Sequence, residues 1–246
     1  MTRPARQAGG FAQKIAALGA RPVIFPAIVI LPAADPEPLL RAHAALADFD
    51  CAIFVSANAV EYGVPDPRSW PLRLVALAPG PGTAEALASV GITDVRVPAT
   101  TFDSEGLLAL PELSSVRGKR IVVFRGNGGR EELIDALSAR GARVDVVVCY
   151  RRAKPESGAA GLDDAFRDGR IDAVTITSSE GLDNLWALAD AALRAAWRGC
   201  PTFVPHPRIA AHARGIGLSV VETAGGDAGL IAGLLEWAAA QPPTKS

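Results

Sequence analysis

The chain has 246 residues, of which 49% are hydrophobic and 21% are charged, so it is long enough for two ordinary α/β domains and has no bias towards disorder. Its formal net charge is −1, which excludes an overall field that would recruit nucleic acid or an anionic membrane. An anionic ligand would therefore have to be held by local groups.

The predicted elements alternate between helices and short apolar strands. A first helix is expected over 7–18, because apolar residues recur at Phe11, Ile15 and Leu18 and Gly19 can end the helix. Short apolar runs typical of buried parallel strands lie at 51–55, 74–78, 121–124, 173–176 and 202–204. This alternation predicts doubly wound parallel sheets.

Motifs of the first half recur in the same order in the second half. Gly19-Ala20-Arg21 returns as Gly141-Ala142-Arg143, after a second predicted helix over 130–140. FDCAIFVSANAVEYG returns as IDAVTITSSEGLDNL, and LVALAPGPGTAEAL resembles CPTFVPHPRIAAHA. Ordered matches of this kind indicate an internal duplication.

Two segments rich in proline and glycine, 31–38 and 151–161, interrupt the rhythm at equivalent places. They predict an inserted domain of 35–152 and a terminal domain of 1–34 plus 153–246, joined by a two-stranded hinge with a cleft between the domains. A strand precedes Arg125, but only two residues precede Arg3. The first strand of the terminal domain is thus expected to be almost absent, which would weaken that domain.

The run VDVVVC predicts a strand buried on both faces that ends at Tyr150, one of two tyrosines in the chain. A basic, proline-ended segment follows it. Open α/β sheets bind ligands at the carboxyl ends of their strands, so this phenol is a candidate acid. Position alone favours a tyrosine that caps a core equally well.

Ser56 and Ser178 each lie between a predicted strand and a predicted helix. Such a serine is expected to cap the helix, and free N–H groups beside it favour anions. The recurrence of the hydroxyl at both places favours a ligand-binding role, to which Asn58 and Ser179 can add donors.

Two glycine-rich turns, 78–87 and 124–133, bring the backbone within reach of a carboxylate or phosphate. Thr83 lies in the first. In the second, Arg125 and Arg130 either fork onto ligand carboxylates or form a solvated rim. Ser104 is expected to cap a helix.

The sequence shows no nucleophile–base pair and no paired catalytic carboxylates. Cys51 and Cys149 lie in apolar runs and are predicted to be core thiols of a reducing compartment. The histidines do not cluster with them, so we expect no metal site. Since there is also no membrane span and no signal core, we expect a cytoplasmic protein.

The chain resembles the uroporphyrinogen-III synthase family over essentially its whole length. The resemblance rests on TRP, VSANAV, APGPGTAEAL, SEGLL, VVFRGNGGREEL, CYRR, TSSEGLDNL and HPRIA, in this order and spacing. It implies two flavodoxin-like domains joined by a two-stranded ladder. It also implies cyclisation of hydroxymethylbilane, a linear tetrapyrrole with eight carboxylates, to uroporphyrinogen III with loss of water and inversion of ring D.

The resemblance further implies that no cofactor is needed, and we expect a monomer. Tyr150 matches the favoured proton donor of the family, and Ser56, Thr83 and Ser178 match its binding positions. The counterpart of Thr83 in the second half is Ile209, so amides around Arg208 and Ile209 are expected to replace its hydroxyl. The substrate-binding residues expected from the turns and the resemblance together are Arg3, Ser56, Ala57, Asn58, Gly80, Pro81, Thr83, Ser104, Arg125, Gly126, Ser178, Ser179, Arg208 and Ile209.

A non-catalytic module that binds a small anion, or senses one, is the alternative from another class, because duplicated domains around a hinged cleft also describe receptors. Such a module would not need Tyr150 at the end of a strand.

Overall fold

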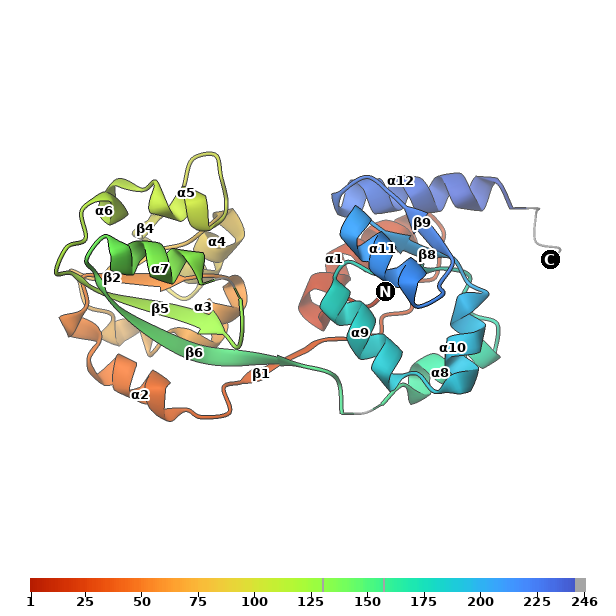
Figure 1. Ribbon diagram of the computed structural model, residues 1–246, viewed down its shortest axis with the longest axis horizontal. Coiled ribbons are helices and arrows are strands. Elements are labelled where there is room, and N and C mark those ends of the chain that lie inside the picture. The colour runs from red at the N-terminus through yellow and green to blue at the C-terminus, as the bar shows by residue number, and fades with distance from the viewer. Residues whose placement is uncertain (130, 157, 242–246) are drawn as a thin grey trace. The chain divides into compact units, whose positions relative to one another are not determined.

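The computed structural model describes residues 1–129, 131–156 and 158–241, and the chain divides into two compact units (Figure 1). Unit 1 comprises Met1–Val29 and Ala153–Ser246, and unit 2 comprises Ile30–Arg152. The sequence places the first division later, after residue 34. The chain crosses between the units in strands β1 and β6.

Unit 2 alternates strands and helices. Its strands are β1 (Val29–Pro32), β2 (Cys51–Phe54), β3 (Val75–Leu77), β4 (Val95–Arg96), β5 (Arg120–Gly126) and β6 (Arg143–Ala153). Its helices are α2 (Glu37–Ala44), α3 (Ala57–Gly63), α4 (Pro81–Ser89), α5 (Ser104–Leu108), α6 (Pro111–Ser114) and α7 (Glu132–Ala139).

The strands of unit 2 form one sheet in the order β1-β6-β5-β2-β3-β4. The pairs β6–β5, β5–β2, β2–β3 and β3–β4 are all parallel. The crossovers between these neighbours are helical, which is the arrangement that a doubly wound sheet requires. The parallel strands all end at one side of the sheet, which we call its carboxyl edge.

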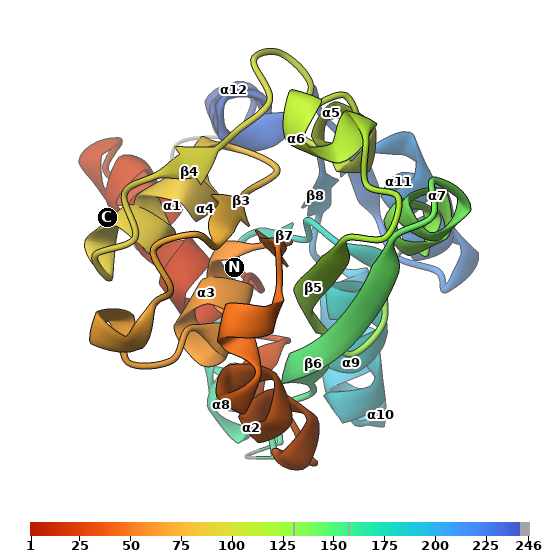
Figure 2. The same cartoon turned by 90° about the vertical axis from the view of Figure 1, so that its left-hand side faces the viewer.

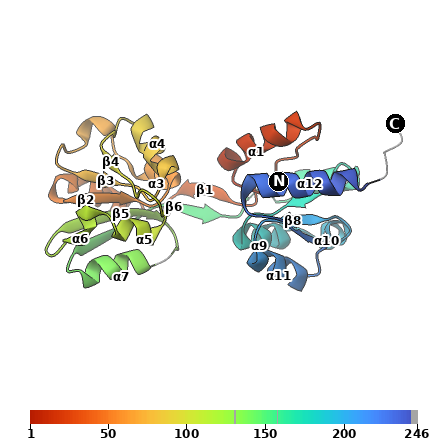
Figure 3. The same cartoon turned by 90° about the horizontal axis from the view of Figure 1, so that it is seen from above.

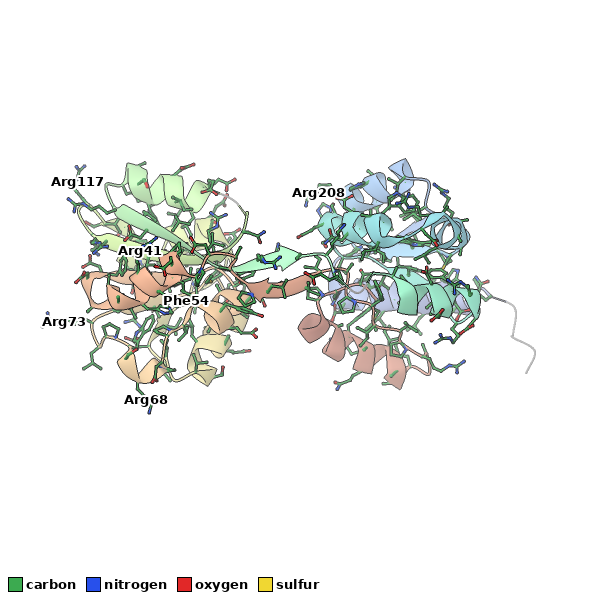
Figure 4. The ribbon with its side chains drawn as sticks, turned by 90° about the horizontal axis from the view of Figure 1, so that it is seen from below. Arg41, Phe54, Arg68, Arg73, Arg117 and Arg208 are labelled. Carbon is green, nitrogen blue, oxygen red and sulfur yellow. The ribbon has the colours of Figure 1, made fainter. Side chains whose placement is uncertain are left out.

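Helices cover both faces of this sheet (Figures 2 and 3). Phe54 and Phe124 point to the face that α2, α3 and α4 cover, where their rings stack with centroids 4.7 Å apart. Ile53 and Val123 point to the opposite face, which α5, α6 and α7 cover. Phe54 lies inside the unit, whereas arginines such as Arg68 point outward (Figure 4). The short apolar runs of the sequence are therefore central strands, as predicted.

Unit 1 has a smaller sheet with helices on both faces. Its strands are β7 (Val174–Thr175), β8 (Thr202–Val204) and β9 (Val220–Glu222), parallel and in that order. Its helices are α1 (Ala5–Ala17), α8 (Ala160–Arg167), α9 (Ser179–Leu188), α10 (Ala191–Arg198), α11 (Pro207–Gly215) and α12 (Gly226–Ala239). Phe203 faces α1 and α12, whereas Val204 faces the layer of α8 to α11.

Two residues at the start of the chain take the place of a first strand in unit 1. Main-chain N–H groups of Phe25 and Ala27 donate to the carbonyls of Met1 and Thr2, at 2.8 and 2.9 Å. The buried Thr2 hydroxyl donates to the Thr175 carbonyl, at the end of β7. Among the described residues before Val29 the structure has no strand, as expected, but backbone pairing extends the sheet beyond β7.

The expectation that β6 is buried on both faces is wrong. Val147 and Cys149 are buried against the α3 side, but Val146 and Val148 are 40% and 37% exposed. On that second face Val144 joins the cluster around α7 and the next valines do not. Sequence runs of valine do not reveal where the covering helix ends.

The predicted helix ends are confirmed. The helix expected over 7–18 is α1, and the helix expected over 130–140 contains α7. Gly19 and Gly141 follow them with φ of 87° and 88°, in the left-handed region that favours glycine. Within the part of the chain that the structure describes, no helix is long and apolar enough to cross a membrane.

Candidate active site

The carboxyl edge of unit 2 gathers the turns that the sequence predicts to be functional. Strand β2 leads into Ser56, β3 into Gly80, β5 ends at Gly126, and β6 passes Tyr150. Because β6, β5, β2 and β3 are successive neighbours in the sheet, these residues lie along one edge.

Ser56 connects two of these turns. It is the N-cap of α3, and its Oγ accepts a hydrogen bond from the Ala59 N–H at 3.1 Å. The same Oγ lies 3.2 Å from the phenol oxygen of Tyr150. The capping role is thus confirmed, and the cap also fixes the position of the phenol.

The ring of Tyr150 is part of the core. The residue is 3% exposed and packs in the cluster that includes Phe124 and Cys149. The two alternatives left by the sequence therefore hold together, because the ring fills the core while the hydroxyl meets Ser56 at the edge. The phenol has no broad exposed face, so any exchange of its proton involves the hydroxyl end.

Arg125 is buried and already paired. Its Nη1 donates to Glu131 Oε1 at 2.9 Å, and its Nη2 donates to the Gly128 carbonyl at 2.7 Å. This guanidinium closes the loop after β5, so its contacts support a structural role instead of the fork onto ligand carboxylates that the sequence predicts. Arg130, the other arginine of that turn, lies outside the described residues.

The turn after β3 places Gly80 as N-cap of α4, Pro81 as its first residue and Thr83 buried in its first turn. The half-exposed Phe102 packs against Gly80, so closely that a Cβ on the glycine would lie 3.2 Å from the Phe102 Cβ. The expectation that Ser104 caps α5 is wrong. Asp103 is the cap, and its Oδ1 accepts from the Gly106 N–H at 3.0 Å.

Unit 1 has an edge of the same kind. Ser178 is the N-cap of α9, and its Oγ accepts from the Gly181 N–H at 3.0 Å, as Ser56 does in unit 2. Ser179 begins the helix and is half-buried. Ala57 and Asn58 take the matching places in α3. Both predicted serine caps are confirmed.

The amides after β8 are occupied. The Arg208 N–H donates to His206 Nδ1 at 3.1 Å, and the Ile209 N–H donates to the His206 carbonyl at 3.0 Å. They are therefore not free to replace the missing hydroxyl, as the sequence suggested. The guanidinium of Arg208 is exposed at the start of α11 and is the better candidate there (Figure 4).

Arg3 is paired as Arg125 is. Its Nη1 lies 2.5 Å from Asp227 Oδ1, and its guanidinium sits over the Phe11 ring at 4.7 Å. Burial alone would raise the pKa of Asp227, but the hydrogen bond and charge of Arg3, with Lys14, hold that pKa below its usual range. The contact fastens α12 to the start of the chain.

The cysteines are not candidate nucleophiles. Cys51, Cys149 and Cys200 are free and buried, as predicted for the first two. Burial raises the pKa of both Cys149 and Cys200 to about 12, so the reactive thiolate is negligible near neutral pH. Within the described ranges no three His, Cys, Asp or Glu side chains group as metal ligands would.

Two residues at the edge of unit 2 were missed. Tyr62 on α3 lies with its ring centroid 6.3 Å from that of Tyr150 and donates to the Ile30 carbonyl. Asn127 donates its N–H to the Tyr150 carbonyl and accepts from the Arg152 N–H, which holds β6 beside the end of β5. The scarcity of tyrosine could have drawn attention to Tyr62, but nothing local marks Asn127.

Comparison with known proteins gives a consistent family. The family model described as "Uroporphyrinogen-III synthase HemD" matches residues 10–228. The chain is 35% identical over 239 residues to the uroporphyrinogen-III synthase of Salmonella typhimurium, covering 93% of this chain and 96% of that one. It is 33% identical over 236 residues to that of Escherichia coli, with the same coverage of both chains.

Solved structures share the fold at lower identity. The chain is 22% identical to a mutant uroporphyrinogen III synthase of Thermus thermophilus, with a TM-score of 0.57 over 98% of this chain and 100% of that one. It is 12% identical to the synthetase of Helicobacter pylori, also with a TM-score of 0.57, over 87% and 92% of the two chains. At these identities the likeness shows a mixed α/β fold with mainly parallel strands.

Proposed function

The chain belongs to the uroporphyrinogen-III synthase family, and from this premise we propose that Tyr150 is the proton donor when it cyclises hydroxymethylbilane to uroporphyrinogen III. The reaction is that of a lyase in tetrapyrrole biosynthesis, and a purely binding or sensory module is not favoured. One observation carries the assignment of the acid. The phenol lies at the carboxyl edge of unit 2 with its oxygen on Ser56 Oγ.

The chemistry asks little of the acid. The terminal hydroxyl of the substrate leaves as water when it takes one proton, because the pyrrole nitrogen pushes electrons into the breaking C–O bond. The cation that forms attacks the far end of the chain, and the ring system later loses one proton, which can restore the phenol. A weak acid with a fixed direction is sufficient for such a step, and positioning supplies the rest.

The carboxylates of the substrate require groups on more than one turn. We assign this role to the hydroxyls of Ser56, Thr83 and Ser178 and to the exposed Arg208, with the turns at Ala57, Gly80 and Ser179 beside them. These groups come from both units, so we propose that both bind one substrate molecule. We also propose that the chain acts as a monomer and without nucleic acid, which the net charge of −1 supports.

We propose that the units are copies of one flavodoxin-like fold that two strands connect. In unit 2 the order β6-β5-β2-β3-β4 corresponds to the order 2-1-3-4-5 of that fold. In unit 1 the backbone pairs of residues 25–27 with Met1 and Thr2, followed by β7, β8 and β9, give the same order.

The direct test is incubation with hydroxymethylbilane, followed by oxidation and separation of the isomers. Unassisted closure of the substrate gives the type I ring, in which ring D is not inverted. We expect the protein to give type III product. Type I product alone, formed at the rate of a protein-free control, would contradict the proposed activity.

The share of each unit in binding is tested with Thr83→Ala in unit 2 and Ser178→Ala in unit 1. Each change is expected to weaken product binding by about 1 kcal/mol, roughly fivefold in Kd, because neighbouring groups hold the same carboxylates. The double variant should lose about the sum. Calorimetric titration measures Kd, a thermal melt separates the lost cap of α9, and Ser89→Ala on the exposed side of α4 is the control. An unchanged Kd for Ser178→Ala would remove unit 1 from the site.

A further inference from the structure

Consecutive residues of β6 point to the same face of the sheet at Tyr150. The parallel register between β5 and β6 is regular from Arg120 opposite Arg143 to Arg125 opposite Val148. It then shifts, so that Gly126 lies opposite Tyr150. Cys149 and Tyr150 both belong to the cluster under α3 as a result.

Without this shift the phenol would point the other way. Side chains alternate along a strand, so Tyr150 would share the face of Val146 and Val148, which is exposed. The extra residue reverses that direction, which is what an irregularity next to a functional site commonly does. The hydroxyl thereby reaches Ser56 at the start of α3.

The ring then occupies the space where Gly126 has no side chain. A Cβ added to Gly126 would lie 2.6 Å from both Cε2 and Cζ of Tyr150, and 3.0 Å from the phenol oxygen. Gly126 does not have a positive φ, so its backbone does not call for glycine. The close approach of the ring is therefore the reason that a side chain is excluded here.

The ring has no free direction in which to retreat. It is 3% exposed, its oxygen is held at 3.2 Å from Ser56 Oγ, and the Tyr62 ring lies beside it. A shift large enough to relieve the contact with a Cβ would move the hydroxyl away from Ser56. The geometry of the acid thus depends on an atom that is missing from its neighbour.

We infer that Gly126 is a positioning residue, whose bare Cα sets the direction of the Tyr150 hydroxyl, together with the register shift beside it. The inference rests on the proposed role of Tyr150 as acid. It replaces the expectation that Gly126 serves by contact of its own backbone with the substrate.

The test variant is Gly126→Ala. We expect kcat for type III product to fall at least tenfold while KM changes less than threefold, because the acid is misdirected and the binding groups stay in place. A fall in kcat of less than twofold would overturn the inference, as would a rise in KM that accounts for the whole loss.

A spectroscopic readout does not depend on activity. The chain has two tyrosines, so protein labelled with 3-fluorotyrosine gives two ¹⁹F signals, and Tyr62→Phe assigns the one from Tyr150. Gly126→Ala should shift the Tyr150 signal. An unmoved signal overturns the inference even if the proposed function is correct, whereas a moved signal with full activity contradicts the role of Tyr150 instead.

A double-mutant cycle identifies the partner. Adding Gly126→Ala to Tyr150→Phe should change kcat less than twofold further, because no hydroxyl remains to be directed. Gly63→Ala is the matched control, since its Cβ would press on Phe124 and Cys149 at 3.1 and 3.2 Å without touching the phenol. It should leave the Tyr150 signal and the ratio of kcat to KM of folded protein unchanged.

If Gly126→Ala alone does not fold, suppression provides the answer. Gly126→Ala combined with Tyr150→Ala has no ring in the way, so its circular dichroism and melting temperature should match those of Tyr150→Ala. A double variant that still fails to fold would show that the glycine serves the backbone and would overturn the inference.

Discussion

Tyr150→Phe should fold normally, bind product and lose at least 99% of type III formation. The ring that fills the core is kept, and only the hydroxyl at 3.2 Å from Ser56 Oγ is removed. Ser56 Oγ keeps its hydrogen bond from the Ala59 N–H, so no buried group is left without a partner. Loss of a general acid costs about 10²- to 10⁴-fold in rate. Single-turnover kinetics with isomer separation measures the effect.

Tyr62→Phe is the matched control for this experiment. It removes the other phenol of the chain, which donates to the Ile30 carbonyl and is not proposed to meet the substrate. We expect a small loss of stability and a turnover within about threefold of the parent. Unchanged type III turnover in Tyr150→Phe would remove this residue from the mechanism.

Phe54→Ala should destabilise unit 2 by about 3–5 kcal/mol, since it empties a fully buried aromatic site. The ring stacks on Phe124 at 4.7 Å and tilts against Trp70 at 6.1 Å, so aromatic contacts are lost along with buried area. Urea unfolding followed by circular dichroism measures the change. A loss below about 1 kcal/mol would contradict the described packing.

Two controls accompany Phe54→Ala. Leu72→Ala removes a side chain that is fully exposed and should change stability by less than about 0.5 kcal/mol. Trp197→Ala empties the core of unit 1, where the indole N–H donates to the Thr202 hydroxyl at 2.9 Å, and should be as costly as Phe54→Ala. Unfolding of the transition that Phe54→Ala affects should be insensitive to Trp197→Ala if the two cores are independent.

Local patterns in the sequence predicted the features that have local causes. The α1 helix follows from the spacing of Phe11 and Ile15, and Gly19 ends it because its φ of 87° suits a residue without Cβ. The caps at Ser56 and Ser178 follow from a hydroxyl between a strand and a helix. Each needs only a few neighbouring residues, which the sequence displays.

Features with distant causes could not be predicted in this way. Arg3 is paired with Asp227, 224 residues further along the chain, so its side chain could not be seen to be occupied. The direction of Tyr150 depends on the register shift against β5, which no alternation of residues announces. Ser104 and Asp103 both suit a cap, and only the backbone decided between them.

The division of the chain also bears on its synthesis. Ile30–Arg152 is one uninterrupted segment and can fold as soon as it leaves the ribosome, whereas Met1–Val29 packs against strands that are translated afterwards. At about 5–20 residues per second this leaves the newly made α1 without its partners for roughly ten seconds. Phe11, which ends up against Phe203 and Leu230, meets water throughout that delay. The nascent N-terminus is therefore the segment that chaperones should bind first.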